Sequence, residues 1–203
     1  MSIRNGNKKG CFFAVLMTIM FVSLAGTTCY ANEVTGPGTD LKTGNAASAN
    51  GVSIYVSKRA KTLSLKQNGV LIGEYPASIG ASSSDGNKKV EGDMRTPSGQ
   101  FYVCTRNDKS VAYLALGLSY PGIEDAKRGY EEGIITQEQR DQIINANLGG
   151  QQPPWETALG GAIEIHGCRV PDGTTHGCVA VDNAVMDVLW SYCNVGVSVT
   201  IGP

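Results

Sequence analysis

Short runs of alternating apolar residues open the region after residue 50 and predict β-strands. Val52, Ile54 and Val56 occupy every second position, and Leu63 and Leu65 repeat the pattern. This is the period of a strand that buries one face and exposes the other. The region therefore begins as an amphipathic sheet.

A hairpin and several further strands follow along the chain. The Asn68-Gly69 pair favours the tight turn that joins two antiparallel strands. The same kind of pattern predicts strands over 70–79, 100–105, 162–166 and 195–201. The sequence thus predicts one mainly β domain over residues 51–203.

Helical periodicity interrupts the strands in the middle of the domain and near its end. Helices are expected over 123–132 and 136–148, where Thr136 and Gln139 form a capping box. These helices either cover the sheet or form an insertion beside a substrate cleft, and the pattern alone favours the first. A third helix, capped by Asp182 or Asn183, is expected to follow.

The first fifty residues have the character of an export signal and a linker. Basic residues precede an apolar run over 11–25, which is short for a membrane span. We expect residues 1–31 to be a signal peptide and 32–50, rich in small and polar residues, to be a flexible linker. The protein is then exported to the periplasm or cell envelope, and an uncleaved signal would tether it to the membrane.

Composition narrows the class of function. The 203 residues carry 17 Lys and Arg against 18 Asp and Glu, a formal net charge of −1. That balance excludes nucleic-acid binding by bulk charge. Six cysteines are too few for a disulfide scaffold in a chain of this length.

Candidate chemistry is concentrated in thirteen residues. The two histidines of the chain begin the tripeptides His166-Gly167-Cys168 and His176-Gly177-Cys178. A Cys/His pair could form a thiol nucleophile with its base. Two His and two Cys could instead hold zinc, or Cys168 could join a disulfide while the histidines make local hydrogen bonds. The spacing alone leaves all three interpretations open.

Two motifs resemble a known family. Thr175-His176-Gly177-Cys178, preceded by His166-Gly167, resembles the active-site signature of L,D-transpeptidases of the YkuD type. The segment Arg95-Thr96-Pro97-Ser98-Gly99-Gln100-Phe101 is similar to that family's Thr-Pro-x-Gly-x-Phe element. Glu91-Gly92-Asp93 and the stretch 123–148 look closer to a subgroup with murein L,D-peptidases. The resemblance spans about residues 52–202.

The resemblance implies a β-sandwich-like catalytic domain with helical insertions and a cysteine mechanism. Cys178 would be the nucleophile and His166 its base, with the carbonyl of Gly167 orienting the ring. Backbone N–H groups near Gly177 and Cys178 would form the oxyanion hole, and His176 would support the loop. No metal or cofactor is implied.

The implied substrates are peptidoglycan stem peptides. D-Ala would leave a donor tetrapeptide, a thioester would form on Cys178, and an amine of a second stem would complete a 3→3 cross-link. With water as acceptor the protein would be an L,D-carboxypeptidase or endopeptidase. The resemblance also implies acylation by carbapenem-type inhibitors and a part in cell-wall biogenesis and cell shape. An alternative of another class is a non-catalytic, zinc-stabilised module that binds the wall.

One departure from the family pattern concerns substrate carboxylates. Many members have Arg or Asn two residues after the nucleophile, where this chain has Ala180. Arg95 and Arg169 are candidates for the substitute cation, and Tyr120 for a residue lining the cleft. A disulfide among Cys104, Cys168 and Cys193 remains open, whereas Cys178 is expected to stay free.

Overall fold

The computed structural model describes residues 50–203. The expected signal peptide (1–31) and all but the last residue of the expected linker (32–50) lie outside the described residues. Within residues 50–203, no helix is both long enough and apolar enough to span a membrane.

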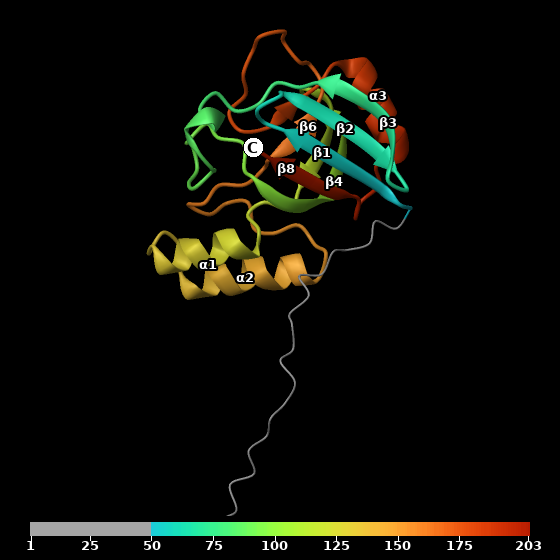
Figure 1. Ribbon diagram of the computed structural model, residues 1–203. Coiled ribbons are helices and arrows are strands. Elements are labelled where there is room, and N and C mark those ends of the chain that lie inside the picture. The colour runs from blue at the N-terminus through green and yellow to red at the C-terminus, as the bar shows by residue number, and fades with distance from the viewer. Residues whose placement is uncertain (1–49) are drawn as a thin grey trace, which may run out of the picture. The chain divides into compact units, whose positions relative to one another are not determined.

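Eight strands form a mixed sheet in the order β3-β2-β1-β8-β4-β5-β6-β7 (Figure 1). The fold is mainly β, as the sequence predicts. The strands are β1 (Val52–Ser57), β2 (Thr62–Gln67), β3 (Val70–Pro76), β4 (Gly99–Ser110), β5 (Tyr113–Leu118), β6 (Glu164–His166), β7 (Val179–Ala180) and β8 (Ser198–Gly202).

The first hairpin forms as the alternating pattern predicts. The side chains of Val52, Ile54 and Val56 are buried in the main core, and their neighbours in β1 point away from it. Asn68 and Gly69 both have positive φ, 50° and 78°, which is the conformation that a type I′ hairpin turn requires.

Strand β4 joins the two halves of the sheet. Its first residues, Gly99–Tyr102, pair with β8, and its later residues pair with β5. A register shift between Val103 and Thr105 interrupts the pairing with β5 just after the pairing with β8 ends, and such irregularities bend a strand. The sheet therefore curls around one hydrophobic core, which includes buried residues of both halves.

Strand β5 lacks the alternation by which the other strands are recognised in the sequence. Its last four residues, from Ala115 to Leu118, are all buried. Because both of its edges are paired and both of its faces are covered there, a period of two does not arise. The sequence pattern therefore predicts no strand at this position.

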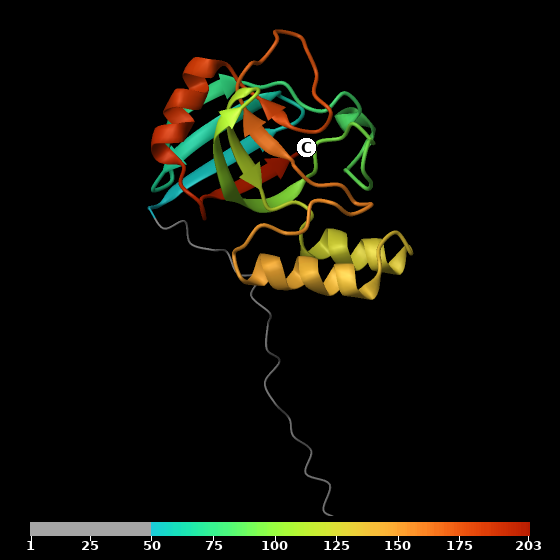
Figure 2. The ribbon, with the colours of Figure 1, turned by 180° about the vertical axis from the view of Figure 1, so that it is seen from behind.

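Helices α1 (Ile123–Glu131) and α2 (Gln137–Leu148) form a hairpin beside the sheet, as Figures 1 and 2 show. The predicted capping box is present: Gln139 N–H donates to Thr136 Oγ1 at 3.2 Å, and Thr136 N–H donates to Gln139 Oε1 at 3.0 Å. The hairpin has a small core of its own, formed by Ala126, Ile135, Ile143 and Leu159. It is an insertion and does not cover a face of the sheet.

Helix α3 (Asn183–Tyr192) packs on the main core through Val185, Met186 and Leu189. Neither candidate cap serves it with a side chain. The Asp182 carboxylate pairs with Arg169, and Asn183 Oδ1 accepts from the Cys168 N–H at 2.7 Å. Both side chains tie the start of α3 to the segment after β6.

Candidate active site

The short parallel pair β6–β7 brings His166 and Cys178 onto one face of the sheet. Ile165 pairs with Val179 and His166 pairs with Ala180. Ile165 and Val179 are buried in the core, so the side chains on either side of them face outward. Cys178 and His166, the nucleophile and base expected from the sequence, therefore lie diagonally across one strand pair.

The imidazole of His166 is held by its Nδ1 atom. Nδ1 lies 2.7 Å from the carbonyl oxygen of Gly167. A carbonyl oxygen only accepts, so Nδ1 carries the proton and donates. In the neutral ring, Nε2 is then the free base. The Gly167 carbonyl thus orients the ring, as the family resemblance implies.

The thiol of Cys178 is largely enclosed. Burial raises its pKa above the usual value, and the backbone N–H of Glu164 opposes that shift. The charge of the Glu164 carboxylate raises the pKa further, while Lys88 lowers it. The net pKa is raised, so the resting thiol keeps its proton at neutral pH and needs a base to become a nucleophile.

Two threonines hold the backbone of the nucleophile. The hydroxyl of Thr175 donates to the carbonyl oxygen of Cys178 at 2.7 Å and accepts from the Gly177 N–H at 3.1 Å. The hydroxyl of Thr96 donates to the same carbonyl at 3.4 Å and accepts from the Gly80 N–H at 2.9 Å. Three separate loops therefore meet at one peptide.

The oxyanion hole differs in part from the expectation. The N–H of Gly177 is engaged by Thr175, whereas the N–H of Cys178 has no acceptor within residues 50–203. Of these two groups, the Cys178 N–H is thus the one available to a developing oxyanion. Gly177 has another reason to be glycine: its φ is 138°, and a Cβ would lie 2.9 Å from the carbonyl oxygen of Arg95.

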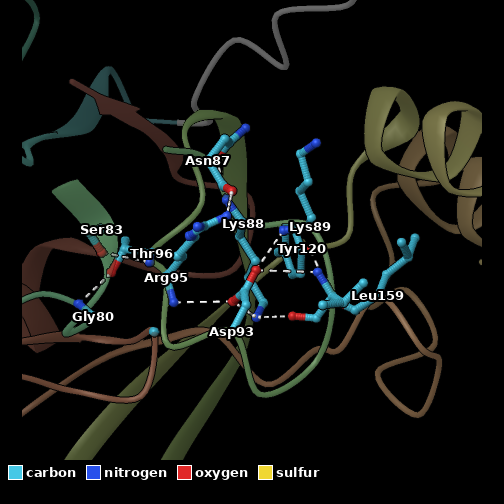
Figure 3. A network of polar contacts seen from close by, with 12 residues as sticks. Gly80, Ser83, Asn87, Lys88, Lys89, Asp93, Arg95, Thr96, Tyr120 and Leu159 are labelled. Carbon is cyan, nitrogen blue, oxygen red and sulfur yellow. Dashed lines mark hydrogen bonds and ion pairs between the residues drawn. The ribbon is translucent and has the colours of Figure 1, made fainter. Parts of the chain in front are cut away.

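A buried ion pair shapes the loop that reaches Arg95 and Thr96 (Figure 3). The Lys88 ammonium, 4% exposed, lies 2.9 Å from Asp93 Oδ1 and donates to the Val90 carbonyl at 3.0 Å. Asp93 also accepts from the N–H groups of Lys89 (2.7 Å), Val90 (3.3 Å) and Arg95 (3.1 Å). One carboxylate thus fixes the fold of residues 88–95.

Three residues expected to bind substrate or to support the loop lie elsewhere or are already engaged. Tyr120 is fully buried and donates its hydroxyl to the Leu159 carbonyl at 3.0 Å. Its expected place in the cleft is wrong because the residue packs in the main core, with its ring against Phe101. Arg169 pairs with Asp182 at 3.1 Å, which compensates its charge. His176 is exposed, and Thr175 has the supporting contacts expected of it.

The Arg95 side chain makes one long hydrogen bond within the described residues. Its Nη1 lies 3.4 Å from the Asn87 carbonyl, and its Nε is buried without a partner within the described residues. The backbone carbonyl of Arg95 lies against Gly177. A role for Arg95 in binding a carboxylate stays a prediction.

Three basic residues, none of which makes an ion pair within the described residues, lie at a cleft of about 620 Å³ that Pro203 also lines. Lys58, Arg59 and Lys61 line it from the turn after β1. Gly80 and Thr174 line it from the loops that hold Cys178. Sequence reasoning did not single out these cations, because they lie far along the chain from the His-Gly-Cys motifs.

The four cysteines within residues 50–203 form no disulfide with one another. Cys104, Cys168, Cys178 and Cys193 are all free thiols. Across residues 50–203, no group of three or more His, Cys, Asp or Glu side chains is placed to hold a metal ion. The described residues therefore offer the zinc interpretation no ligand set.

Glu164 is the residue that sequence reasoning missed although a signal was present. In the strand expected over 162–166, Ile163 and Ile165 share the buried face, so Glu164 shares the outer face with His166. Its carboxylate influences the pKa of Cys178. The alternation that predicted the strand also placed this carboxylate in the site.

Comparison with known proteins gives the family. A model of the YkuD L,D-transpeptidase catalytic domain matches residues 51–201. No curated protein sequence matches significantly. The helical cell-shape determining protein Pgp2 from Campylobacter jejuni has a similar structure, with 20% identity, a TM-score of 0.51, and 74% of this chain and 46% of that one covered.

Two further solved structures are similar. Bd1075 from Bdellovibrio bacteriovorus is 24% identical with a TM-score of 0.49, over 75% of this chain and 48% of that one. An L,D-transpeptidase from Xylanimonas cellulosilytica is 19% identical with a TM-score of 0.44, over 75% and 61%. This chain spans about half the length of Pgp2 and Bd1075. With its two motifs, its curled sheet and the family model over three quarters of its length, the chain belongs to the YkuD family of L,D-transpeptidase catalytic domains.

Proposed function

We propose that this protein is a cysteine L,D-transpeptidase that acts on peptidoglycan stem peptides. The observation that carries the proposal is the placement of Cys178 and His166 on one face of β6–β7, with the ring held through Nδ1. That geometry leaves Nε2 as the base for a thiol whose pKa is raised.

The reaction follows in two steps. Nε2 of His166 takes the thiol proton as Sγ of Cys178 attacks the carbonyl at the L-centre of a diamino acid in a donor tetrapeptide. The N–H of Cys178 stabilises the oxyanion. The bond to D-Ala breaks, the leaving amine takes the proton from His166, and a thioester remains. The amine of a second stem peptide then attacks the thioester, passes its proton to His166 and releases the thiol.

The basic cleft supports an anionic substrate. Stem peptides carry several carboxylates, and the basic residues Lys58, Arg59 and Lys61 line a cleft next to the loops of the nucleophile. Ala180 provides no such charge. We propose that this cleft takes the part that Arg or Asn has in other members.

Hydrolysis is the second candidate. The helical insertion and Ala180 resemble the murein peptidase-like subgroup, and a structure of similar fold belongs to Pgp2. With water as acceptor, the same thioester would give a trimmed tripeptide and no cross-link.

Mass spectrometry and product analysis test the proposal. Wild-type protein incubated with a carbapenem should gain the mass of one inhibitor molecule, and purified tetrapeptide should lose D-Ala. Cys178→Ser should do neither. Cys168→Ser is the matched control, because Cys168 is an exposed free thiol in the same His-Gly-Cys context. Adduct and activity that survive Cys178→Ser would contradict the proposal, and dimers or tripeptides among the products decide between transfer and hydrolysis.

We also propose that the protein is exported. Residues 1–31 would direct the chain to the periplasm or cell envelope, where the substrate lies. A reporter enzyme fused after residue 31 should appear outside the cytoplasm, and one fused to a chain without residues 1–31 should not.

A further inference from the structure

Glu164 begins β6 and stands beside the nucleophile. The strand register that pairs Ile165 with Val179 places Glu164 opposite Cys178. On its other side Glu164 pairs with Gly117 of β5. A Cβ on Gly117 would lie 2.9 Å from Cη2 of Trp155, so the Trp155 ring borders the same face. Glu164 is therefore set between the reacting thiol and an aromatic wall.

The carboxylate of Glu164 has no partner of its own. Within residues 50–203 it makes no hydrogen bond to a side chain and no ion pair, although it is half-buried. Burial raises its pKa, and the electrostatic influence of the nearby His166 opposes that shift without cancelling it. Within the described residues, two more enclosed carboxylates have a cationic partner: Asp93 has Lys88 and Asp125 has Arg128.

An unpaired carboxylate at this place is unfavourable for the resting enzyme. A half-buried charge without a counter-ion costs free energy. In addition, the negative charge of Glu164 raises the pKa of Cys178 and so opposes formation of the thiolate. A cation bound to Glu164 would relieve both effects at once.

We propose that Glu164 is a substrate-recognition residue that binds the distal ammonium of the diamino acid at the third position of the donor stem peptide. This inference rests on the proposed function. It adds a specificity determinant whose charge is opposite to that of the basic cleft. The cleft binds carboxylates of the substrate, and Glu164 binds an amine. Binding of the correct substrate then neutralises Glu164 and makes the thiol easier to deprotonate.

Charged thiol reagents test the electrostatics without any peptidoglycan substrate. Methanethiosulfonates that carry an ammonium, a sulfonate or no charge are allowed to react with the full chain, and modification at Cys178 is followed by site-resolved mass spectrometry. We expect the cationic reagent to react about tenfold faster than the anionic one, relative to their rates with a model thiol. Glu164→Gln should lose this preference.

Glu131→Gln is the matched control, because Glu131 is an exposed carboxylate at the end of α1. It should keep the wild-type preference. A ratio that is the same in Glu164→Gln and in the wild type would overturn the inference. Circular dichroism and urea unfolding check that both variants fold.

Two donor tetrapeptides test the identity of the ligand. One has diaminopimelate at the third position, and the other has 2-aminopimelate, which keeps the distal carboxylate and lacks the distal amine. The wild type should prefer the first in kcat/KM by roughly tenfold or more, and Glu164→Gln should prefer it by less than twofold. A preference that survives in Glu164→Gln, or a wild type that turns over both donors equally, would overturn the inference.

The two assays separate this inference from the proposed function. If the wild type turns over neither donor, the proposed function fails, and with it the identity of the ligand. The reagent ratios still report in that case whether Glu164 selects cations at Cys178. If both donors are turned over without discrimination, the function stands and the role of Glu164 does not.

Discussion

Replacing Lys88 by methionine should destabilise the protein through the charge that it leaves behind. Lys88→Met keeps most of the volume of the side chain and removes the ammonium that lies 2.9 Å from Asp93. The Asp93 carboxylate would then keep its three backbone N–H donors and lose its counter-ion. The side chains of the pair are only 4% and 11% exposed, so water cannot replace the lysine.

The expected cost is about 3–5 kcal/mol, the range for removing one partner of a buried ion pair. Adding Asp93→Asn to Lys88→Met should recover much of this loss. Asparagine can keep an oxygen for the N–H groups of Lys89 and Val90, which both donate to Oδ2 of Asp93, and gives up the acceptor of the Arg95 N–H at Oδ1. It has no charge to leave unpaired. The double variant should therefore be more stable than Lys88→Met alone. Only the argument from unpaired charge predicts that a second substitution raises the unfolding free energy.

The Lys88–Asp93 pair should also make the unfolding free energy depend on pH in the acidic range. Burial acts to raise the pKa of Asp93, but hydrogen bonds from the Lys89 backbone, the Lys88 side chain and the backbones of Arg95 and Val90 outweigh it, and the net pKa is lowered. A lowered folded-state pKa stabilises the fold above the unfolded value and is lost as the pH falls through the folded value. Unfolding free energy should thus decline below about pH 4, and less steeply in Asp93→Asn.

Urea unfolding followed by far-ultraviolet circular dichroism measures these differences, at pH 7 and at steps down to pH 3. Equal m-values among the variants would show that the comparison is one of stability alone. A loss below about 1 kcal/mol for Lys88→Met, or a double variant less stable than the single one, would refute the reasoning. The first result would mean that the pair behaves as an exposed salt bridge.

Three further predictions concern the loop of the nucleophile. Gly177→Ala should lower kcat/KM at least tenfold, because the added Cβ would lie 2.9 Å from a backbone carbonyl. Gly133→Ala, at a φ of 70° with open space around it, should cost only the backbone strain of about 1–2 kcal/mol; equal effects on activity would contradict the steric argument. Thr175→Val should cost roughly 1–3 kcal/mol in unfolding free energy and lower kcat/KM, whereas Thr174→Val, exposed and adjacent, should leave the unfolding free energy unchanged. Alkylation of Cys178 by iodoacetamide should still accelerate above pH 9, since its pKa is raised; a plateau below pH 8 would indicate a resting thiolate–imidazolium pair.

Whether a strand could be predicted from the sequence depended on how many of its faces are buried. β1 has one covered face, and its alternation predicts it. β5 is covered on both faces over its last four residues, so its apolar run carries no period of two. The capping box of α2 is local in sequence and could be predicted, whereas the position of the helical hairpin beside the sheet depends on long-range packing on Leu159.

The residues of the candidate site likewise fall into those that local sequence identifies and those whose surroundings only the fold determines. His166 and Cys178 were identified because their tripeptides are close in sequence and rare in composition. The ion pair of Lys88 with Asp93 was not, because a lysine and an aspartate five residues apart in a polar loop resemble surface charges until the loop closes over them. Tyr120 was misjudged for the converse reason: it is part of the main core, and that burial is not visible from the residue itself.

The position of the nucleophile depends on a loop distant in sequence more than on its own strand. β7 is only two residues long and lies at the edge of the sheet, a place where backbone pairing by itself is weak. The backbone N–H of Ser78 donates to the Ala180 carbonyl at 2.8 Å, and the Ala180 N–H donates back at 2.9 Å. Thr96, at the other end of the same loop, holds the Cys178 carbonyl. The loop from Ser78 to Thr96 thus completes the sheet edge on which Cys178 sits, and the buried Lys88–Asp93 pair within that loop becomes a determinant of catalytic geometry.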